Sequence, residues 1–239
     1  MGARFQELDR CHTALGELVL RRRWDPRFDR EVHEIKLNDE YLMSSLFTTS
    51  ERELARLALA GAPAPLDVVV GGLGLGYTAH TVLDNPAVRS VLVVDALGEV
   101  IDWHRRGLVP GGAELAADPR CTLVHGDFFA MSRSADGFDP TTPHRRFHAI
   151  IVDIDHSPRH LLHPGNADFY QPEGIRRLAE RLHPGGVFAL WSNDRPDDDY
   201  TATLSAHFAR TTAEVVRFPN PLQDRDATST VYLATAPMG

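Results

Sequence analysis

The chain has 239 residues, of which 43% are hydrophobic and 24% are charged, so it can bury a core of ordinary composition. Its net charge of −8 argues against a nucleic-acid partner, because a phosphate backbone requires a basic face, and is compatible with a cationic substrate. No stretch reaches the ~18 apolar residues of a transmembrane helix, and no apolar signal segment begins the chain. From these absences we expect no membrane partner. The two cysteines, Cys11 and Cys121, match no metal or disulfide pattern, so we expect free thiols in a cytoplasmic protein.

The N-terminal quarter of the chain predicts a small β unit followed by a linking helix. Residues 16–23 and 31–37 have the composition of two paired strands, with a turn signal directly after the second. Residues 51–60 are typical of a capped helix, which a proline-rich stretch then ends. We therefore expect a small unit at residues 1–65 and a main domain at residues 66–239.

A glycine-rich turn at the start of the main domain is the strongest local signal. Residues 66–70 contain a β-branched run that is typical of a strand buried on both faces of a parallel sheet. Four glycines follow within six residues: Gly71, Gly72, Gly74 and Gly76. Residues 77–83 then predict a helix. Strand, turn and helix together present a bare backbone and helix-terminal N–H groups, where a nucleotide or nucleoside can bind.

From this turn onward, predicted strands alternate with predicted helices. The further strands lie at 91–94, 122–124, 147–152, 187–191, 213–218 and 229–234, and the further helices at 99–107, 169–182 and 200–210. Residues 131–146 are polar and irregular, so we expect a loop there. The alternation predicts an α/β fold with a Rossmann-like, doubly wound, mostly parallel seven-stranded sheet that ends in an antiparallel pair. Such sheets bind ligands beyond the carboxyl ends of their strands.

Acidic residues stand at the ends of the next two strands. Asp95 lies nineteen residues after Gly76, where an acid can hold both hydroxyls of a ribose. Asp127 can accept a hydrogen bond from an adenine amine, with Phe128 or Phe129 against the ring. Asp127 can equally be the N-cap of a short helix. Together with the four glycines, Asp95, Asp127 and Phe128 are the candidate nucleoside-binding residues.

The fourth strand runs into the sequence Asp153-Ile154-Asp155-His156, where a reacting group would meet the end of a nucleoside. An alkyl amine has a pKa near ~10 and is protonated at neutral pH, so a carboxylate that accepts its proton frees it to attack. We predict Asp153 as this catalytic base, and Asp155 and His156 as substrate-binding residues. Strand alternation would turn Asp155 away from Asp153. We expect no metal, because Pro158 interrupts the helix that would align the nearby histidines.

In order and spacing, these pieces resemble the spermidine synthase family of polyamine aminopropyltransferases, over roughly residues 16–236. The matching stretches are LVLRRR, VHEIKLNDE, VVVGGLGLG, VLVVDALGEVI, DPR-x-x-LVHGDFF, FHAIIVDIDHSP and FY-x-x-EG-x-x-x-LAERLHPGGVFAL. The resemblance implies the class I S-adenosylmethionine-dependent methyltransferase fold with a small N-terminal β domain. It also implies a part in polyamine biosynthesis and a possible homodimer.

The resemblance further implies roles for single residues. The turn's glycines Gly72, Gly74 and Gly76 would line a sulfonium nucleoside. Asp95 would take the place of the family's ribose-binding Glu, Asp127 would hold adenine, and Asp153 matches the Asp that deprotonates the attacking amine. The donor would be decarboxylated S-adenosylmethionine or S-adenosylmethionine itself, and the acceptor a small-molecule amine.

Departures from the family pattern leave the transferred group open. Gly74 stands where the family has an Asp that faces the aminopropyl amine, which also removes an obstacle to a donor bearing a carboxylate. A family Gln aligns near Met43, and Asp155 follows Asp153 by two residues, whereas the family's second Asp follows by three. We therefore predict aminopropyl transfer, with methyl transfer to a small molecule and a catalytically degenerate nucleoside-binding homologue as alternatives. An NAD-dependent enzyme is disfavoured, because the relaxed dinucleotide fingerprint at 74–79 begins too far past its strand.

Overall fold

The computed structural model describes residues 5–60, 62–222 and 225–239, so the predicted start of the N-terminal unit at residues 1–4 lies outside the described residues. The N-terminal part is a four-stranded antiparallel sheet in the order β1-β2-β3-β4. Its strands are β1 (Phe5–Thr13), β2 (Gly16–Asp25), β3 (Arg30–Leu37) and β4 (Glu40–Ser44). The two strands expected from the sequence are β2 and β3, and β1 and β4 extend the sheet at its two edges.

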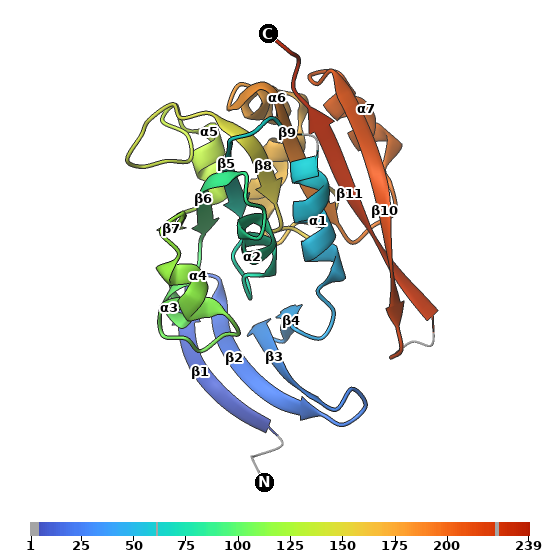
Figure 1. The fold of residues 1–239 in the computed structure, drawn as a ribbon. Coiled ribbons are helices and arrows are strands. Elements are labelled where there is room, and N and C mark those ends of the chain that lie inside the picture. Colours follow the sequence, from blue (N-terminus) through green and yellow to red (C-terminus); the bar gives the residue numbers. More distant parts are fainter. Residues whose placement is uncertain (1–4, 61, 223–224) are drawn as a thin grey trace.

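The rest of the chain forms the expected α/β fold around a seven-stranded sheet in the order β10-β11-β9-β8-β5-β6-β7 (Figure 1). Its strands are β5 (Leu66–Gly71), β6 (Val88–Asp95), β7 (Cys121–His125), β8 (Phe147–Val152), β9 (Leu182–Ser192), β10 (Arg210–Asn220) and β11 (Arg225–Thr235). The strands from β7 to β9 pair in parallel, whereas β11 pairs antiparallel with both β9 and β10. The predicted doubly wound, mostly parallel sheet with an antiparallel pair is thus confirmed.

Helices cover both faces of this sheet. They are α1 (Thr49–Ala60), α2 (Tyr77–Leu83), α3 (Gly98–Arg105), α4 (Gly112–Ala117), α5 (Phe128–Arg133), α6 (Pro172–Ala179) and α7 (Asp198–Ser205), with a 3-10 helix η1 (Pro164–Tyr170). α1 packs against α2 and β9, whereas α6 packs against η1, α5 and α7. This two-sided covering is what a doubly wound sheet requires to bury both of its apolar faces.

The apolar run of β5 follows from its central place in the sheet. Val68 and Val70 belong to one hydrophobic cluster and Val69 to the other, and all three are 0% exposed. A strand that is buried on both faces has no polar side with which to alternate. Leu18 and Leu20 of β2 join the cluster of Val68 and Val70, so the N-terminal sheet shares a core with the main part. The division into two units at residue 65 stays a prediction.

Several stretches of the structure differ from the sequence prediction. The single helix predicted over 169–182 is wrong, because η1 ends at Tyr170, α6 begins at Pro172, and β9 begins at Leu182. Proline has no N–H with which to continue a preceding helix, and the residue before it avoids helical backbone. The short helices α4 and α5 have no counterpart in the prediction, since six residues show no readable period.

The order of strands reverses beside β5. The chain passes from β5 to β6 and β7 on one side and then returns to β8 on the other side of β5. Open α/β sheets bind ligands at such a reversal, outside the carboxyl ends of the strands. Figure 1 shows the N-terminal sheet next to α2 and α3 at this end of the molecule. The ligand site is therefore expected between the main sheet and the N-terminal sheet.

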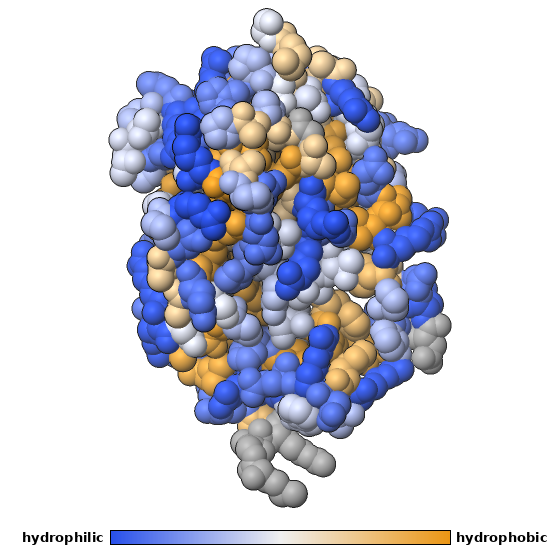
Figure 2. All heavy atoms as spheres, viewed as in Figure 1, coloured by the Kyte–Doolittle hydropathy of each residue, from blue (hydrophilic) through white to orange (hydrophobic). Residues whose placement is uncertain are grey.

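The surface is mixed in character. Hydrophilic residues are spread over the whole face shown in Figure 2, with hydrophobic residues visible between them. Large exposed apolar side chains occur at scattered positions, among them Phe5, Trp24 and Leu222. Within the described ranges, no helix combines the length and the hydrophobicity that crossing a membrane would need.

Candidate active site

The glycine turn links β5 to α2 at the point where the strand order reverses. Its backbone N–H groups already have partners inside the protein. The N–H of Gly72 donates to the Val94 carbonyl at 2.9 Å, and the N–H of Leu73 donates to Asp95 Oδ2 at 2.8 Å. The N–H of Gly76 donates to the Leu73 carbonyl at 2.8 Å. A pyrophosphate would compete with a carboxylate already seated on this turn, so the geometry does not favour NAD.

Two positions of the turn require glycine for a visible reason. Gly72 has a φ of 93°, and a Cβ there would lie 2.2 Å from the Asp153 carbonyl oxygen. Gly74 has a φ of 49°, and a Cβ there would lie 2.7 Å from Met43 Sδ. The same sulfur accepts a hydrogen bond from the N–H of Leu75 at 3.0 Å. The missing side chains therefore let β8 and β4 approach the turn, and Met43 covers the position where the family's Asp would stand.

Asp95 connects the turn to the end of β6. Its Oδ2 accepts the hydrogen bond from Leu73, and its Oδ1 accepts one from the N–H of Leu97 at 2.8 Å. Burial raises the pKa of Asp95, and hydrogen bonds from backbone N–H groups oppose that rise. The backbone N–H groups of Leu97, Leu73 and Gly74 all contribute to this effect, and a carboxylate can accept about four hydrogen bonds, so Asp95 keeps about one acceptor position for a ribose hydroxyl. The predicted ribose-binding role fits this geometry and stays a prediction.

Asp127 and Phe128 face different surroundings although they are neighbours. Asp127 is exposed and caps α5, with its Oδ1 accepting from the N–H of Ala130 at 3.0 Å, so the N-cap alternative is confirmed. The exposed carboxylate can still meet an adenine amine. Phe128 is 2% exposed, and its ring stacks on Phe138 with centroids 4.6 Å apart. The ring also fills the space beside Gly71, so it supports the turn, and a contact with adenine stays a prediction.

Asp153 follows β8 and lies against the glycine turn. Its N–H donates to the Gly71 carbonyl at 2.9 Å, and Thr78 of α2 donates its hydroxyl to Asp153 Oδ2 at 2.8 Å. Burial raises the pKa of Asp153 to about 6, and the Thr78 hydrogen bond opposes that rise. A carboxylate with this pKa is mostly ionised at neutral pH and is more basic than an ordinary Asp. These are the properties that a general base needs.

Glu51 is a site residue that the sequence analysis missed. It lies in the first turn of α1, and its Oε2 is buried without a hydrogen-bond partner in the described part of the chain. Burial, and then the charge of Asp153, raise the pKa of Glu51 to about 8. Glu51 is therefore protonated at neutral pH while Asp153 is ionised, as expected of two neighbouring carboxyl groups. A Glu at the start of a helix is too common to reveal this pairing.

Asp155 lies two residues after Asp153 in a different environment. It is 1% exposed, and three groups of the following loop donate to its carboxylate: the Leu162 N–H at 2.7 Å, the Asn166 amide at 3.0 Å and the Tyr170 hydroxyl at 2.8 Å. The two carboxylates therefore point to different places, and Asp155 holds its own loop together. The carbonyl of His156 accepts from the N–H of Asn193 at 2.7 Å. Substrate binding by Asp155 and His156 stays a prediction.

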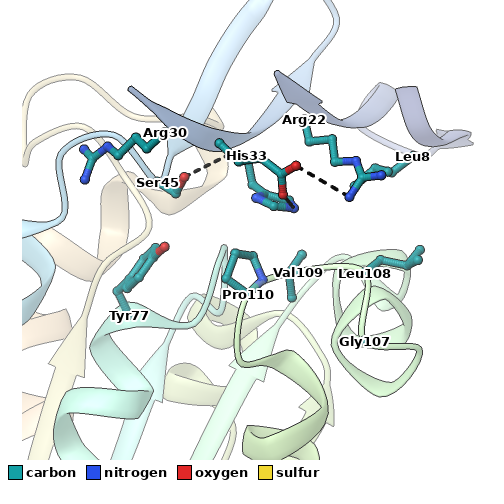
Figure 3. A pocket seen from close by; sticks show the side chains of 11 residues that line it. Leu8, Arg22, Arg30, His33, Ser45, Tyr77, Gly107, Leu108, Val109 and Pro110 are labelled. Atoms are coloured by element: carbon teal, nitrogen blue, oxygen red, sulfur yellow. Dashed lines mark hydrogen bonds and ion pairs between the residues drawn. The ribbon is translucent and has the colours of Figure 1, made fainter. Parts of the chain in front are cut away.

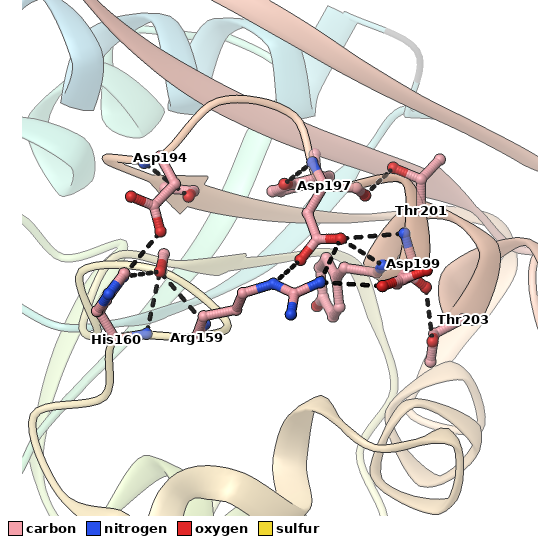
Figure 4. A network of polar contacts seen from close by, with 11 residues as sticks. Arg159, His160, Asp194, Asp197, Asp199, Thr201 and Thr203 are labelled. Atoms are coloured by element: carbon pink, nitrogen blue, oxygen red, sulfur yellow. Dashed lines mark hydrogen bonds and ion pairs between the residues drawn. The ribbon is translucent and has the colours of Figure 1, made fainter.

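A separate polar network lies beyond the ends of β8 and β9 (Figure 4). Arg159 pairs with Asp197 and Asp199, and His160 Nδ1 lies 2.9 Å from Asp194 Oδ2. These side chains satisfy one another and connect the loop after β8 to the start of α7. Among the residues that the structure describes, no group of three or more His, Cys, Asp or Glu is arranged to hold a metal.

The strand order, the two helical layers and the glycine turn define an α/β protein of the class I methyltransferase-like type. Within that class, residues 48–215 match the spermine/spermidine synthase domain, and the chain belongs to this family. The resemblance proposed from the motifs is thus confirmed. The family is one of transferases, as the names of its relatives also indicate.

Curated relatives include both aminopropyl- and methyltransferases. Polyamine aminopropyltransferase 2 of Pseudomonas aeruginosa is 29% identical over 167 residues, which are 66% of this chain and 44% of that protein. Putrescine N-methyltransferase 2 of Nicotiana attenuata is 30% identical over 134 residues, which are 56% of this chain and 33% of that protein. The chain thus spans less than half the length of these two relatives. Because this chain is about equally identical in sequence to both, these relatives do not distinguish aminopropyl transfer from methyl transfer.

Solved structures extend the likeness to the N-terminal sheet. The spermidine synthase from Thermotoga maritima superposes with a TM-score of 0.73 at 17% identity, over 98% of this chain and 74% of that one. Human methyltransferase-like protein 13 in complex with SAH gives 0.59 at 17% identity, over 78% of this chain and 82% of that one. At these identities the comparison shows the fold, and the predicted fold class is confirmed. The cytoplasmic location and the homodimer stay predictions.

Proposed function

We propose that the chain is a transferase that uses an S-adenosyl sulfonium donor and transfers an aminopropyl group to a small-molecule amine, with Asp153 as general base. The position of Asp153 carries this proposal. Its backbone bonds to the glycine turn at 2.9 Å, and Thr78 orients its carboxylate at 2.8 Å. One acid of raised pKa therefore stands beside the predicted nucleoside site. Membership of the spermine/spermidine synthase domain family supports the same class of reaction.

The reaction is a displacement at the carbon bound to the donor's sulfonium. The amine nitrogen forms a bond to this carbon, the carbon–sulfur bond breaks, and its electron pair stays on sulfur in a neutral thioether. The attacking ammonium must first lose a proton, which Asp153 accepts, because its pKa of about 6 leaves it ionised at neutral pH. Glu51, with a pKa of about 8, is neutral at that pH and adds no second charge. Holding both reactants in one site supplies much of the acceleration.

The residues of the donor half fit a sulfonium nucleoside better than a dinucleotide. Asp95 keeps an acceptor position for a ribose hydroxyl beside its three backbone donors, and the exposed Asp127 can accept from the adenine amine. The N–H groups of the turn donate to Asp95, to the Met43 sulfur and to backbone carbonyls, so a pyrophosphate would lack donors. The donor would be decarboxylated S-adenosylmethionine for aminopropyl transfer.

Methyl transfer to an amine is the second candidate, and the surroundings of Gly74 favour it. Met43 Sδ occupies the space beside Gly74, 2.7 Å from the place of a Cβ. An aminopropyl ammonium would find no carboxylate there to bind it. The carboxylate of S-adenosylmethionine would meet no negative charge there to repel it. The putrescine N-methyltransferases, at 30% identity, are relatives that carry this other reaction in their name.

Mass spectrometry of reaction products tests the proposal directly. The full chain is incubated with each donor, S-adenosylmethionine or its decarboxylated form, and with a panel of diamines, polyamines and amino acids. We expect one amine to gain an aminopropyl group, with methylthioadenosine as the second product. A methylated amine with S-adenosylhomocysteine would instead establish the second candidate. Reactions without the chain and with Asp153→Asn are the controls, and no product from either donor would contradict both candidates.

A further inference from the structure

A cleft of about 680 Å³ separates the N-terminal sheet from the start of α2 and from the segment between α3 and α4 (Figure 3). One wall carries Arg22, Arg30 and His33, and the other carries Tyr77 and Pro110. Tyr77 immediately follows the glycine turn, and the next residue is the Thr78 that orients the base. The cleft therefore adjoins both the donor half and the proton acceptor, which is where the reacting end of a substrate must lie.

The charges that line this cleft do not balance. Glu31 is the one carboxylate in its lining, and it already lies 3.6 Å from the Arg22 guanidinium. Burial lowers the pKa of His33, so this ring is neutral at neutral pH. Arg30 donates to the carbonyl of Leu46 and forms no ion pair with any carboxylate in the described part of the chain. One guanidinium of the lining is therefore left without a counter-charge.

A second guanidinium approaches from α1. Arg52 lies 5.3 Å from the centroid of the Tyr77 ring. Burial raises the pKa of Tyr77 and the charge of Glu51 adds to that rise, while the Ser45 hydroxyl and the charges of Arg52 and Arg30 lower it, so both arginines act on the same phenol. Arg52 donates to the Thr48 hydroxyl at 3.3 Å, and no carboxylate in the described part of the chain forms an ion pair with it. Arg52 thus adds to the positive charge next to the cleft.

The attacking ammonium of a polyamine would meet the Asp153 carboxylate, whereas its further ammonium groups would lie near these two guanidinium groups and be repelled. A carboxylate would instead receive charge-assisted hydrogen bonds from two guanidinium groups, whose planar donors match its geometry. We propose that the cleft holds a carboxylate carried by one of the two substrates, bound by Arg30 and Arg52; this inference rests on the proposed function. The carboxylate can belong to the donor, as S-adenosylmethionine, or to the acceptor, as an amino acid in place of a diamine.

Calorimetric titration of the full chain tests this assignment with two matched pairs of ligands. S-adenosylmethionine and its decarboxylated form differ by one carboxylate, and so do ornithine and putrescine, which are titrated in the presence of methylthioadenosine. We expect the carboxylate-bearing member of one pair to bind about tenfold tighter, or more, than its partner. The pair that shows this preference identifies which substrate carries the group.

Substitutions connect the preference to the two arginines. Arg30→Gln and Arg52→Gln should each reduce it severalfold, and the double variant should abolish it. Arg56→Gln is the matched control, because Arg56 lies one turn away on α1 and pairs with Glu53 at 2.6 Å, whereas Arg52 lies over the Tyr77 ring that lines the cleft. Arg30→Lys keeps the charge and should retain part of the preference for the carboxylate. This variant distinguishes the loss of the charge in Arg30→Gln from a disturbance of folding.

Three results would overturn the assignment: equal affinities within both pairs, tighter binding of the members without the carboxylate, or a preference that survives in the double variant. Titration with methylthioadenosine separates this failure from failure of the proposed function. If the wild-type chain does not bind methylthioadenosine, the proposed function is contradicted. If it binds methylthioadenosine and shows no carboxylate preference, only the assignment of the cleft is contradicted.

Discussion

The proposed donor half and the proposed acceptor half of the site are held in different ways. In the donor half, backbone groups of β5, β6 and β8 bond to one another through the glycine turn, and Asp95 closes the turn with two hydrogen bonds of 2.8 Å. In the acceptor half, side chains of the N-terminal sheet, such as Arg30, and of the start of α2, such as Tyr77, line a cleft of about 680 Å³. A change in the donor half would disturb the central strand, whereas the acceptor half can change one side chain at a time. The family's nucleoside site can therefore persist while the acceptor changes.

Asp153→Asn is expected to have the largest effect, because Asp153 is where the two halves meet. The amide cannot take a proton from the attacking amine, so kcat/KM should fall by about 10³-fold, within the usual range for a general base. The measurement is turnover of the amine identified by mass spectrometry, with methylthioadenosine affinity as a control that should stay unchanged. Turnover close to that of the wild type would remove Asp153 from the role of base.

Asp155→Asn should affect stability rather than chemistry. The carboxylate accepts from three loop donors while 1% exposed, and an amide would place its own N–H₂ against at least one of them. We expect a loss of about 2 kcal/mol, which lowers Tm by about 6 °C in a domain of this size. Thermal unfolding measures this, and the pH profile of residual turnover should keep its shape. Unchanged Tm with lost turnover would instead give Asp155 a ligand-binding role.

Gly74→Asp tests the junction between the donor half and the N-terminal sheet. A φ of 49° is one that Asp tolerates, and the new side chain would displace the flexible end of Met43. The restored carboxylate should shift the ratio of affinities toward decarboxylated S-adenosylmethionine by about tenfold, as a charge-assisted hydrogen bond would. Gly74→Asn, of the same size without the charge, is the control. If the ratio of the two donor affinities is equal in both variants, the charge at this position does not discriminate between the two donors.

Glu51→Gln should have the smallest effect on turnover, and it should change the pH dependence of stability. The pKa of Glu51 rises from 4.5 to about 8 on folding, so its contribution to stability is complete below pH 4.5 and is lost as the pH rises through 8. The variant has no such loss. Its Tm should exceed that of the wild type by about 10 °C at about pH 9 and match it at about pH 4. Glu53→Gln on the same helix is the control, and parallel Tm curves for Glu51→Gln and wild type would contradict the pairing.

The sequence predicted the fold well because its signals are local. The valine run of β5, the glycines after it and the helix over 77–83 each follow from a few consecutive residues, and the structure has all three. The helix predicted over 169–182 failed for an equally local reason, since Pro172 begins a helix and cannot continue one. The short elements α4 and α5 could not be predicted, because six residues give no period.

By itself, the sequence determined the α/β fold class with its mostly parallel sheet, the glycine turn and the acids at the strand ends, since β-branched runs and glycines specify backbone shape directly. Only the tertiary structure decided what surrounds those acids. It separated Asp153 from Asp155, which are two residues apart, and it brought Glu51 to Asp153 across about a hundred residues of chain. It also assembled the positive cleft from β3, α1 and α2. The pKa of a carboxyl group depends on its burial and on neighbours that are distant in the chain, and a short stretch of sequence predicts neither.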